Sequence, residues 1–411
     1  MRILQMSRWF FPHVGGASVR VYQTAKNLTE MGHEVHLLTH NPQSIGQCNL
    51  DEECSLYEKH PHGFYVYRLP YYKHLGGSGN WALSIPLMAK KAVEIIQKEK
   101  IEVILSHNPP YLVGAASMKA SMLTGVPVVT LVHDVWGASH YSQAQYTVGN
   151  FLQRVCIKRS KRIVAVSEGL KNIISKDFRI PREKISVAPT GIDVEAFKID
   201  KKGSKDVLAK YARLGIDKKV EYLFFVGILR KWAGVSNLID AFAEIVRSGR
   251  HPKLKLLLVG GGGDKEAFEA KTKKLGVRDR VIFTDAVPYA NVPYLIGLAT
   301  VATAPFPSTS VTDQSKLMSP HKVLEYMVIG KPIVASAVGG MENYIKDGET
   351  GLLCKPDDVA DLKEKIVYLL ENSKVRDRLA KNAYNYVRGG GFEWRDSANV
   401  VEKALKEAVE G

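Results

Sequence analysis

The residues from 319 to 351 hold two kinds of group that together could bind a phosphorylated ligand rich in hydroxyls. Glu325 stands among apolar neighbours in a predicted helix. Ser319, a good N-cap residue, marks the start of that helix. Gly339 and Gly340 follow a short apolar run and are expected to open a second helix, whose free N–H groups could bind phosphate. The segment therefore predicts a carboxylate for ribose hydroxyls and N–H donors for a diphosphate, the pairing that a sugar nucleotide requires.

Lys322 has two explanations within this segment. It precedes Glu325 by three residues, which is the spacing of an ion pair on one helix face. Such a pair would be structural. Alternatively, the ammonium group of Lys322 contacts phosphate, and we therefore include it among the candidate phosphate-binding residues.

Two further loops place glycines or cations after predicted strands. Gly15 and Gly16 let the backbone pass close to a phosphate or sugar, although a tight strand-to-helix turn would need the same glycines. Arg230 and Lys231 occupy a similar turn later in the chain, where two cations could neutralise a diphosphate leaving group. The alternative for this pair is that of most lysines and arginines, a solvated surface position.

His133 and Asp134 directly follow a predicted strand, Val128–Val132. Polar side chains at the carboxyl end of a parallel strand face the ligand-binding edge of the sheet and not its core. His133 could hydrogen-bond a sugar hydroxyl or stabilise developing charge, and Asp134 could orient it. A histidine satisfied by a nearby backbone carbonyl is the structural alternative. We treat the two residues as the catalytic candidates.

The elements that must position these residues alternate between strand and helix, which is typical of α/β folds with parallel sheets. The 411 residues exceed the ~250–300 residues of a single core, so two domains are expected. A polar, lysine-rich stretch at Thr190–Val220 is the predicted linker, and the chain beyond Asp357 is expected to be helical. The other predicted strands are Ile3–Met6, Glu34–Leu38, Phe64–Arg68, Val103–Ser106, Ile163–Val166, Ile185–Ala188, Leu223–Val226, Leu254–Val259, Val281–Phe283, Val301–Ala304 and Ile333–Ala335.

Composition narrows the class of protein. With 45% hydrophobic and 24% charged residues, the chain is an ordinary globular protein, and its four cysteines lack metal-ligand spacing. It shows neither a leader pattern nor an apolar run of ~18–20 residues, which predicts a cytoplasmic location. The net charge of +15 favours anionic partners such as phosphates or the anionic face of a membrane; we expect no nucleic-acid partner.

The glycine-rich segment LLLVGGGGDKE does not match the dinucleotide pattern G-x-G-x-x-G, because the third position falls on Lys265 or Glu266. The chain also lacks a GxxxxGK[ST] phosphate loop, an HExxH pair and a D-x-D pair that could hold a metal with a nucleotide. We therefore expect no metal and no cofactor beyond the donor substrate.

Seven of these segments, in order, resemble the retaining glycosyltransferases of family 4, which have the GT-B fold. They are FPHVGGASVRVYQTAKNLTEMGHEVHLLT, LVHDVWG, IVAVSEGLKNII, SVAPTGIDVEAFK, FFVGILRKWAGVSNLIDAF, LLLVGGGG and SPHKVLEYMVIGKPIVASAVGGMENYIKDGETGLL. The resemblance implies two doubly wound Rossmann-like domains facing a central cleft. It places an acceptor-binding domain at 1–191, a nucleotide-sugar-binding domain at 192–391, and a last helix at 392–411 that crosses back to the first domain.

The resemblance also implies roles for individual residues. Gly16 would approach the donor phosphate or sugar, His133 the transferred sugar, and Glu325 the ribose. Arg20 and Trp136, which belong to the first two matching segments, would lie on the acceptor side.

The chain departs from the family pattern at three donor-site positions. Ile228 and Ala233 stand where the family often has a phosphate-binding Arg and Lys, and we infer that Arg230 and Lys231 replace them. Leu317 stands where the first glutamate of an E-x7-E motif would be, so the chain resembles the subset with SPxKxxEYM instead.

These observations predict a metal-independent, retaining glycosyltransferase of the hexosyltransferase type. It would move a sugar from a nucleoside-diphosphate sugar to a hydroxyl of a glycan or lipid-linked acceptor, at the cytoplasmic face of a membrane. Two alternatives stay open. A sugar-nucleotide 2-epimerase can share this fold, but it needs acid/base carboxylates that the first-domain loops do not offer. A non-catalytic sugar-nucleotide-binding subunit would explain the three departures.

Overall fold

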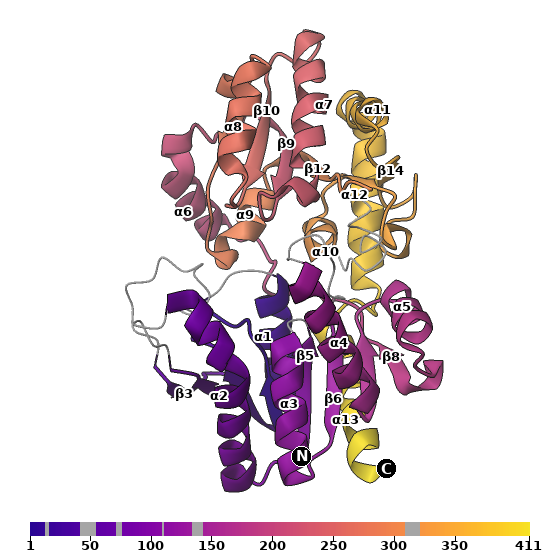
Figure 1. Cartoon of the computed structure of the whole chain (residues 1–411). Helices are drawn as coiled ribbons and strands as arrows, with labels where there is room; N and C mark the ends of the chain where they lie inside the picture. Colours follow the sequence, from indigo (N-terminus) through magenta and orange to yellow (C-terminus); the bar gives the residue numbers. More distant parts are fainter. Residues whose placement is uncertain (13–15, 42–54, 71–75, 109–110, 134–142, 309–320) are drawn as a thin grey trace. The chain divides into compact units, whose positions relative to one another are not determined.

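The structure is a computed structural model that describes residues 1–12, 16–41, 55–70, 76–108, 111–133, 143–308 and 321–411 (Figure 1). It divides into two compact units, and we describe each by itself. The first unit comprises Met1–Thr190 together with Trp394–Gly411, and the second unit comprises Gly191–Glu393. The last segment of the chain therefore lies with the first unit.

The first unit contains an eight-stranded sheet in the order β3-β4-β2-β1-β5-β6-β7-β8. Its strands are parallel except β3, which pairs antiparallel with β4 at the edge. Strands buried on both faces read as nearly continuous apolar runs, as in β6, where Thr130 is the one polar residue. The bounds are β1 Arg2–Met6, β2 Glu34–Thr39, β3 Tyr57–Lys59, β4 Tyr65–Arg68, β5 Val103–Asn108, β6 Val128–Val132, β7 Arg162–Ala165 and β8 Ile185–Val187.

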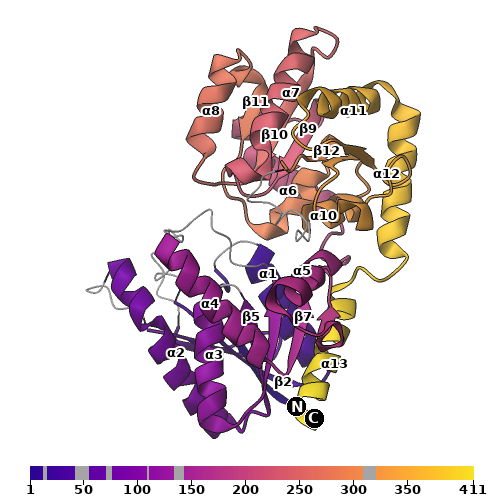
Figure 2. The ribbon, with the colours of Figure 1, turned by 45° about the vertical axis from the view of Figure 1, so that its right-hand side comes forward.

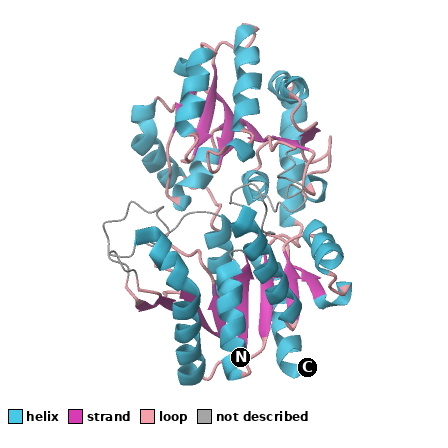
Figure 3. Ribbon diagram, in the orientation of Figure 1, coloured by secondary structure: helices cyan, strands magenta, loops and turns pink. Residues whose placement is uncertain are grey.

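Helices cover both faces of this sheet (Figure 3). Three of them, α2, α3 and α4, lie side by side on one face, while α1 packs against α13 on the other (Figure 1, Figure 2). The α13 helix is held to this unit by a hydrogen bond between Glu402 and His33 (2.9 Å) and by an ion pair between Glu407 and Arg162 (3.0 Å). The bounds are α1 Gly16–Glu30, α2 Gly76–Glu99, α3 Tyr111–Thr124, α4 Gln143–Arg159, α5 Glu168–Phe178 and α13 Trp394–Glu410.

The second unit contains a six-stranded, wholly parallel sheet in the order β11-β10-β9-β12-β13-β14. The strands are β9 Glu221–Val226, β10 Leu254–Val259, β11 Val281–Phe283, β12 Ala299–Ala304, β13 Ile333–Ser336 and β14 Leu352–Cys354. The helices are α6 Lys201–Tyr211, α7 Val235–Arg247, α8 Lys265–Lys274, α9 Val292–Ile296, α10 His321–Ile329, α11 Val359–Glu371 and α12 Ser373–Arg388.

The alternation of side chains along β9 builds two cores in this unit. Tyr222 and Phe224 point to the face covered by α6, α9, α10 and α12, whereas Leu223 and Phe225 point to the face covered by α7, α8 and α11. All four side chains are fully buried. Burial of a Leu or Phe side chain contributes ~1.5–3 kcal/mol relative to exposure, so both faces stabilise the sheet that carries the site.

The structure confirms the α/β class, the doubly wound parallel sheets and every predicted strand to within two residues at each end. It also adds two short strands that the sequence analysis missed, β3 and β14. Within the described residues, no helix combines the length and apolarity needed to cross a bilayer.

The predicted linker at Thr190–Val220 is wrong in part, because this stretch folds into the second unit. It contains α6, whose Val207 and Tyr211 are buried in the core together with Phe197. Two buried apolar positions, four residues apart, mark the inner face of this helix, and the partly buried Leu208 packs against the same core. The lysines on its outer face hid them from a reading of composition.

The predicted helix after Gly339 and Gly340 is also wrong. Both glycines adopt left-handed conformations, and the residues that follow form a three-residue 3-10 turn, Met341–Asn343. A turn this short has no helix dipole to offer a phosphate.

Candidate functional site

His133 lies in the first unit, directly after β6, and contacts a second histidine that the sequence analysis missed. His107 belongs to the neighbouring strand β5, and its Nδ1 lies 2.8 Å from Nε2 of His133. The two ring centroids lie 5.0 Å apart, and the ring planes are inclined to one another by 22°. The prediction ended β5 at Ser106, two residues early, which left His107 outside the strand. The two histidines therefore meet at the carboxyl edge of the first-unit sheet.

His107 is in turn held by Gln5 of β1. The side-chain nitrogen of Gln5 lies 2.9 Å from Nε2 of His107 and donates to the carbonyl oxygen of Val21 at 2.9 Å. Both Gln5 and His107 are buried. Burial, together with the positive charge of Arg20, lowers the pKa of His107 to about 3, so this histidine is neutral. Three adjacent strands thus supply a buried polar chain that ends at His133.

Arg20 of α1 is buried, and its guanidinium donates to the carbonyl oxygen of Ala188 at 3.3 Å and to the hydroxyl of Thr190. It also lies over the indole ring of Trp394, 5.3 Å from the ring centroid. These contacts join α1 to the segment after β8 and to the start of α13. They give Arg20 a structural role, and its predicted place on the acceptor side stays a prediction.

The remaining first-unit candidates fall near the limits of what the structure describes. Gly16 is the first residue of α1 and is exposed. Gly15, Asp134 and Trp136 lie outside the described residues.

Glu325 is a buried carboxylate in the middle of α10, where the residues Val323–Val328 are all buried. It accepts a hydrogen bond at 2.9 Å from the phenol of Tyr289, which lies in a 3-10 turn before α9. Burial raises the pKa of Glu325 to about 7, against the opposing effects of the Tyr289 hydrogen bond and the charge of Lys322. The sequence pattern indicates Glu325 but carries no signal for Tyr289.

The predicted ion pair between Lys322 and Glu325 does not form, since Lys322 is not among the cations that the described structure places within 4.0 Å of a carboxylate. Its ammonium group lies over the ring of Phe225, 3.8 Å from the centroid, and 4.8 Å from that of Phe306. Burial lowers the pKa of Lys322 to about 7, while the charge of Glu325 acts in the opposite direction. Contact with aromatic faces partly replaces the water that the ammonium group has lost.

The position of Lys322 brings its charge to the carboxyl edge of the second-unit sheet. A Cβ atom on Gly227, the first residue after β9, would lie only 2.9 Å from the Lys322 nitrogen. Ligands of parallel α/β sheets bind at this edge.

Arg230 and Lys231 follow β9 and contact the glycine-rich loop that follows β10. The Arg230 guanidinium lies 4.0 Å from a carboxylate oxygen of Asp264, and the backbone N–H of Lys231 donates to the same oxygen at 3.1 Å. The guanidinium also packs so closely on Gly263 that a Cβ there would lie 2.7 Å from it. Asp264 is thus the present partner of Arg230, and the sequence analysis did not identify it.

Close backbone approach explains the other glycines of these loops. A Cβ on Gly260 or Gly262 would lie 2.2 or 2.3 Å from a carbonyl oxygen of the β9 loop, that of Gly227 or Leu229. Glycine is therefore required where the two loops cross, without reference to any ligand.

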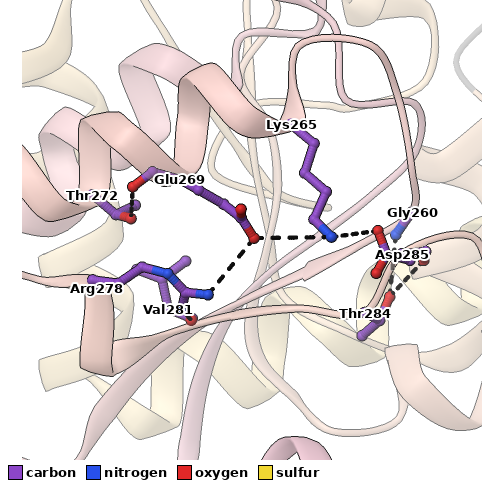
Figure 4. Close-up of polar contacts among 8 residues, drawn as sticks. All are labelled: Gly260, Lys265, Glu269, Thr272, Arg278, Val281, Thr284 and Asp285. Carbon is purple, nitrogen blue, oxygen red and sulfur yellow. Dashed lines mark hydrogen bonds and ion pairs between the residues drawn. The ribbon is translucent and has the colours of Figure 1, made fainter.

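A polar network fixes the far side of the glycine-rich loop (Figure 4). Lys265, in the first turn of α8, pairs with Asp285 at 2.5 Å and with Glu269 at 3.9 Å. The backbone N–H of Gly260 donates to the hydroxyl of Thr284 at 3.3 Å. These contacts join the loops after β10 and β11, so the loop beside Arg230 is held from both sides.

The described residues contain one group whose ligand types could suit a metal ion. Ligand atoms of Glu34, His36 and Glu99 lie within 4.8 Å of one another in the first unit. His36 is already hydrogen-bonded to Glu34 at 3.0 Å and to Tyr67 at 3.3 Å, and Glu99 pairs with Lys98 at 3.1 Å. These bonds account for the cluster as part of the β2, β4 and α2 packing.

Two family models match consecutive parts of the chain. "Glycosyltransferase Family 4" matches residues 14–196, and "Glycosyl transferases group 1" matches residues 208–386. The matches fall almost entirely within the first and the second unit, respectively.

Two relatives match this chain over nearly their whole length. The D-inositol 3-phosphate glycosyltransferase of Frankia alni is 26% identical over 408 residues, covering 96% of this chain and 95% of that protein. The N-acetyl-alpha-D-glucosaminyl L-malate synthase of Bacillus anthracis is 25% identical over 380 residues, covering 91% of this chain and 89% of that protein.

Solved structures share the fold over the whole chain. Sucrose-phosphate synthase from Thermosynechococcus elongatus has a TM-score of 0.80 at 20% identity, covering 99% of this chain and 98% of that one. Anabaena HepE in complex with UDP-glucose has a TM-score of 0.74 at 19% identity, covering 99% of both chains.

Proposed function

Because this chain belongs to the glycosyltransferases of family 4 and has the GT-B fold, we propose that it is a retaining hexosyltransferase that uses a nucleoside-diphosphate sugar. The observation that carries the proposal is the buried carboxylate of Glu325 near the partly buried Lys322, whose ammonium lies at the ligand-binding edge of the second-unit sheet. Ionisable groups withdrawn from water in this way are costly to keep for stability alone. A ligand that carries both hydroxyls and phosphates accounts for both groups.

Glu325 binds the ribose in this proposal. A carboxylate that already accepts one hydrogen bond from Tyr289 keeps acceptor capacity for two neighbouring hydroxyls. The similarity to HepE, whose structure contains UDP-glucose, supports a sugar nucleotide as the ligand class.

Lys322, Arg230 and Lys231 neutralise the diphosphate. Lys322 belongs to α10, and its ammonium lies beside Gly227, directly after β9; Arg230 and Lys231 belong to the loop that follows β9. Phosphate oxygens replace Asp264 as the partner of the Arg230 guanidinium. Hydrogen bonds between a guanidinium and a diphosphate, in which both partners are charged, are stronger than the present contact with a carboxylate oxygen at 4.0 Å. Arg230 and Lys231 thereby replace the family cations absent at Ile228 and Ala233.

The transfer breaks the bond between the anomeric carbon and the phosphate oxygen of the donor. The acceptor hydroxyl forms the new bond on the same face of the sugar, and its proton passes to the departing phosphate. His133 hydrogen-bonds the transferred sugar, and the phosphate-binding cations stabilise the leaving group. No metal takes part in this scheme.

The acceptor is a hydroxyl of a glycan or lipid-linked precursor, and the enzyme works in the cytoplasm at the face of an anionic membrane. The formal charge of +15 supports attraction to such a surface.

A thermal-shift panel of UDP-, GDP- and ADP-sugars tests the donor site. A ligand at 100 times its Kd stabilises by ~2.7 kcal/mol, about 5–10 °C for a unit of this size. We expect one nucleotide class to give this shift in the wild type and to give a much smaller one in Glu325→Ala. No shift with any of the three would overturn the proposal.

Product analysis tests the chemistry. The enzyme is incubated with the donor identified by thermal shift and with extracts that contain glycan or lipid-linked acceptors. The new glycosidic bond should keep the anomeric configuration of the donor. Excess EDTA should leave the rate of transfer unchanged. An inverted product would refute retention, and a rate abolished by EDTA would refute metal independence. A changed donor in the absence of acceptor would identify an epimerase instead.

A further inference from the structure

We infer that Gln5 and His107 are positioning residues that fix His133 as the neutral tautomer with its proton on Nδ1. The inference rests on the proposed role of His133 in the transfer and concerns how that residue is prepared for it. It follows from three hydrogen bonds inside the first unit, taken in order from the most buried.

The carbonyl of Val21 fixes the orientation of the Gln5 amide. The amide nitrogen lies 2.9 Å from that carbonyl oxygen, which can only accept a hydrogen bond. The reversed orientation would bring two oxygens face to face and would leave both amide protons without an acceptor. Gln5 already leaves its oxygen without a partner among the described residues, the smaller of the two costs.

The Gln5 amide in turn fixes the tautomer of His107. Its nitrogen carries two protons and no lone pair for hydrogen bonding, so Nε2 of His107, at 2.9 Å, must be the acceptor. The proton of the neutral ring therefore sits on Nδ1. The charge of Arg20 and complete burial both disfavour a second proton on this ring.

His107 then fixes His133. The Nδ1–H of His107 donates to Nε2 of His133 at 2.8 Å and occupies the lone pair at that atom. The proton of His133 must lie on Nδ1. A proton on Nε2 would face another N–H across 2.8 Å, so that atom is closed to acid–base chemistry.

The consequence for the transfer is a histidine that donates a hydrogen bond without a charge. Glycosyl transfer passes through a transition state with positive charge on the sugar ring. An imidazolium beside that ring would repel the developing charge, whereas a neutral imidazole can donate its Nδ1–H to a sugar hydroxyl without this penalty. The chain from Gln5 to His133 keeps the imidazole neutral and sets the direction of its donor.

Nitrogen-15 NMR of the full chain, labelled at its histidines, reads the tautomers directly. His133 and His107 are assigned by the signals lost in His133→Ala and His107→Phe. We expect both residues to show a protonated Nδ1 and an unprotonated Nε2 in the wild type. In His107→Phe and in Gln5→Met, the Nε2 atom of His133 should gain protonated character. A protonated Nε2 on His133 in the wild type would refute the inference, and so would a tautomer unchanged in both variants.

Kinetics separate positioning from mere packing. His107→Phe should lower kcat about 10- to 100-fold with the donor KM changed less than twofold. His107→Asn, whose amide can donate from nearly the position of Nδ1, should recover most of the loss. A matched control is His33→Phe, a buried histidine that bonds Glu402 at the opposite edge of the sheet. It should leave both kcat and the His133 tautomer unchanged.

The two proposals fail separately. The tautomer can be measured without any substrate, so a chain that transfers no sugar could still show it. An active transferase in which His133 carries its proton on Nε2 would refute only the present inference. Equal kcat values for His107→Phe and the wild type would also count against it.

Discussion

Tyr289 and Glu325, 36 residues apart, share a hydrogen bond of 2.9 Å that no sequence pattern predicts. The phenol donates to a carboxylate that the helix α10 would otherwise leave without a described hydrogen bond in an apolar core. Burial and the charge of Glu325 raise the pKa of Tyr289 well above its ordinary value, so the phenol remains a donor throughout the working pH range. The pair therefore presents Glu325 at a fixed position for a ligand.

Tyr289→Phe should weaken donor binding while the protein stays folded. Loss of the hydrogen bond costs about 1 kcal/mol of stability and lets the pKa of Glu325 rise further. We expect the donor KM to increase about 5- to 10-fold in steady-state kinetics. Tyr294→Phe is the matched control, because this tyrosine bonds Asp200 at an exposed position. Equal donor KM values for the two variants would show that Tyr289 does not contribute to donor binding.

The stability of the free protein should depend on pH through Glu325. Its pKa of about 7 in the fold exceeds the ordinary 4.5, so between these values the folded chain holds a proton that the unfolded chain releases. Stability contributed by this group is therefore present at low pH and is lost as the pH rises toward 7.

Glu325→Gln removes this dependence. Relative to the wild type, the variant should gain on the order of 2 kcal/mol in the free energy of unfolding between pH 5 and pH 7, measured by denaturant titration. The window stops at 7 because the lowered pKa of Lys322 acts in the opposite sense above it. Glu342→Gln, at an exposed carboxylate, should show no such gain; an equal gain there would refute the assignment.

Arg230→Ala should reduce affinity for the nucleoside diphosphate itself. One charge-assisted contact to phosphate is worth ~1.5–3 kcal/mol, so we expect the Kd measured by calorimetry to rise at least tenfold. The effect should shrink at high salt, since part of it is screened. Arg278→Ala serves as control, because Arg278 pairs with Glu269 in the same unit. If both variants bind alike, Arg230 is a surface cation after all.

Gly234→Ala should destabilise the second unit strongly. This glycine has a φ of 76°, and a Cβ on it would lie 1.7 Å from the carbonyl oxygen of Pro305. Gly276 has nearly the same φ, 73°, with nothing within 4 Å of the added atom. Gly276→Ala should thus cost only ~1–2 kcal/mol for the left-handed backbone, and Gly234→Ala at least 2 kcal/mol more. Urea unfolding of both variants measures the difference, and equal losses would show that the loop gives way.

Much of this architecture could be predicted because buried parallel strands are nearly continuous apolar runs, which a one-dimensional pattern records well. Val128–Val132 and Leu254–Val259 were predicted with their observed bounds for this reason. The α6 helix was missed because only Val207 and Tyr211 are buried in the core, with Leu208 partly so, too few positions to show a period among lysines.

The candidate site was predictable only where one segment carried its own signal. Glu325 follows from its place in an apolar segment whose predicted N-cap, Ser319, lies outside the described residues, and His133 from its place after a strand. Gln5, His107 and Tyr289 have no such signal, because their roles arise from strand neighbours or from loops distant in sequence. Lys322 was mispredicted for the same reason. Its spacing to Glu325 favours an ion pair, but in the structure its ammonium group lies over the rings of Phe225 and Phe306.

The two stretches that build the first unit are separated in the chain by the entire second unit. The helix α13, with Trp394 against Arg20, is therefore synthesised only after more than two hundred intervening residues have left the ribosome. Until then, the N-terminal sheet lacks the helix that packs on α1, and the apolar surface that α13 will bury stays exposed or is covered by a chaperone. Removal of α13 should thus impair folding of the first unit, most of which is synthesised first, although the truncation is at the C-terminal end of the chain.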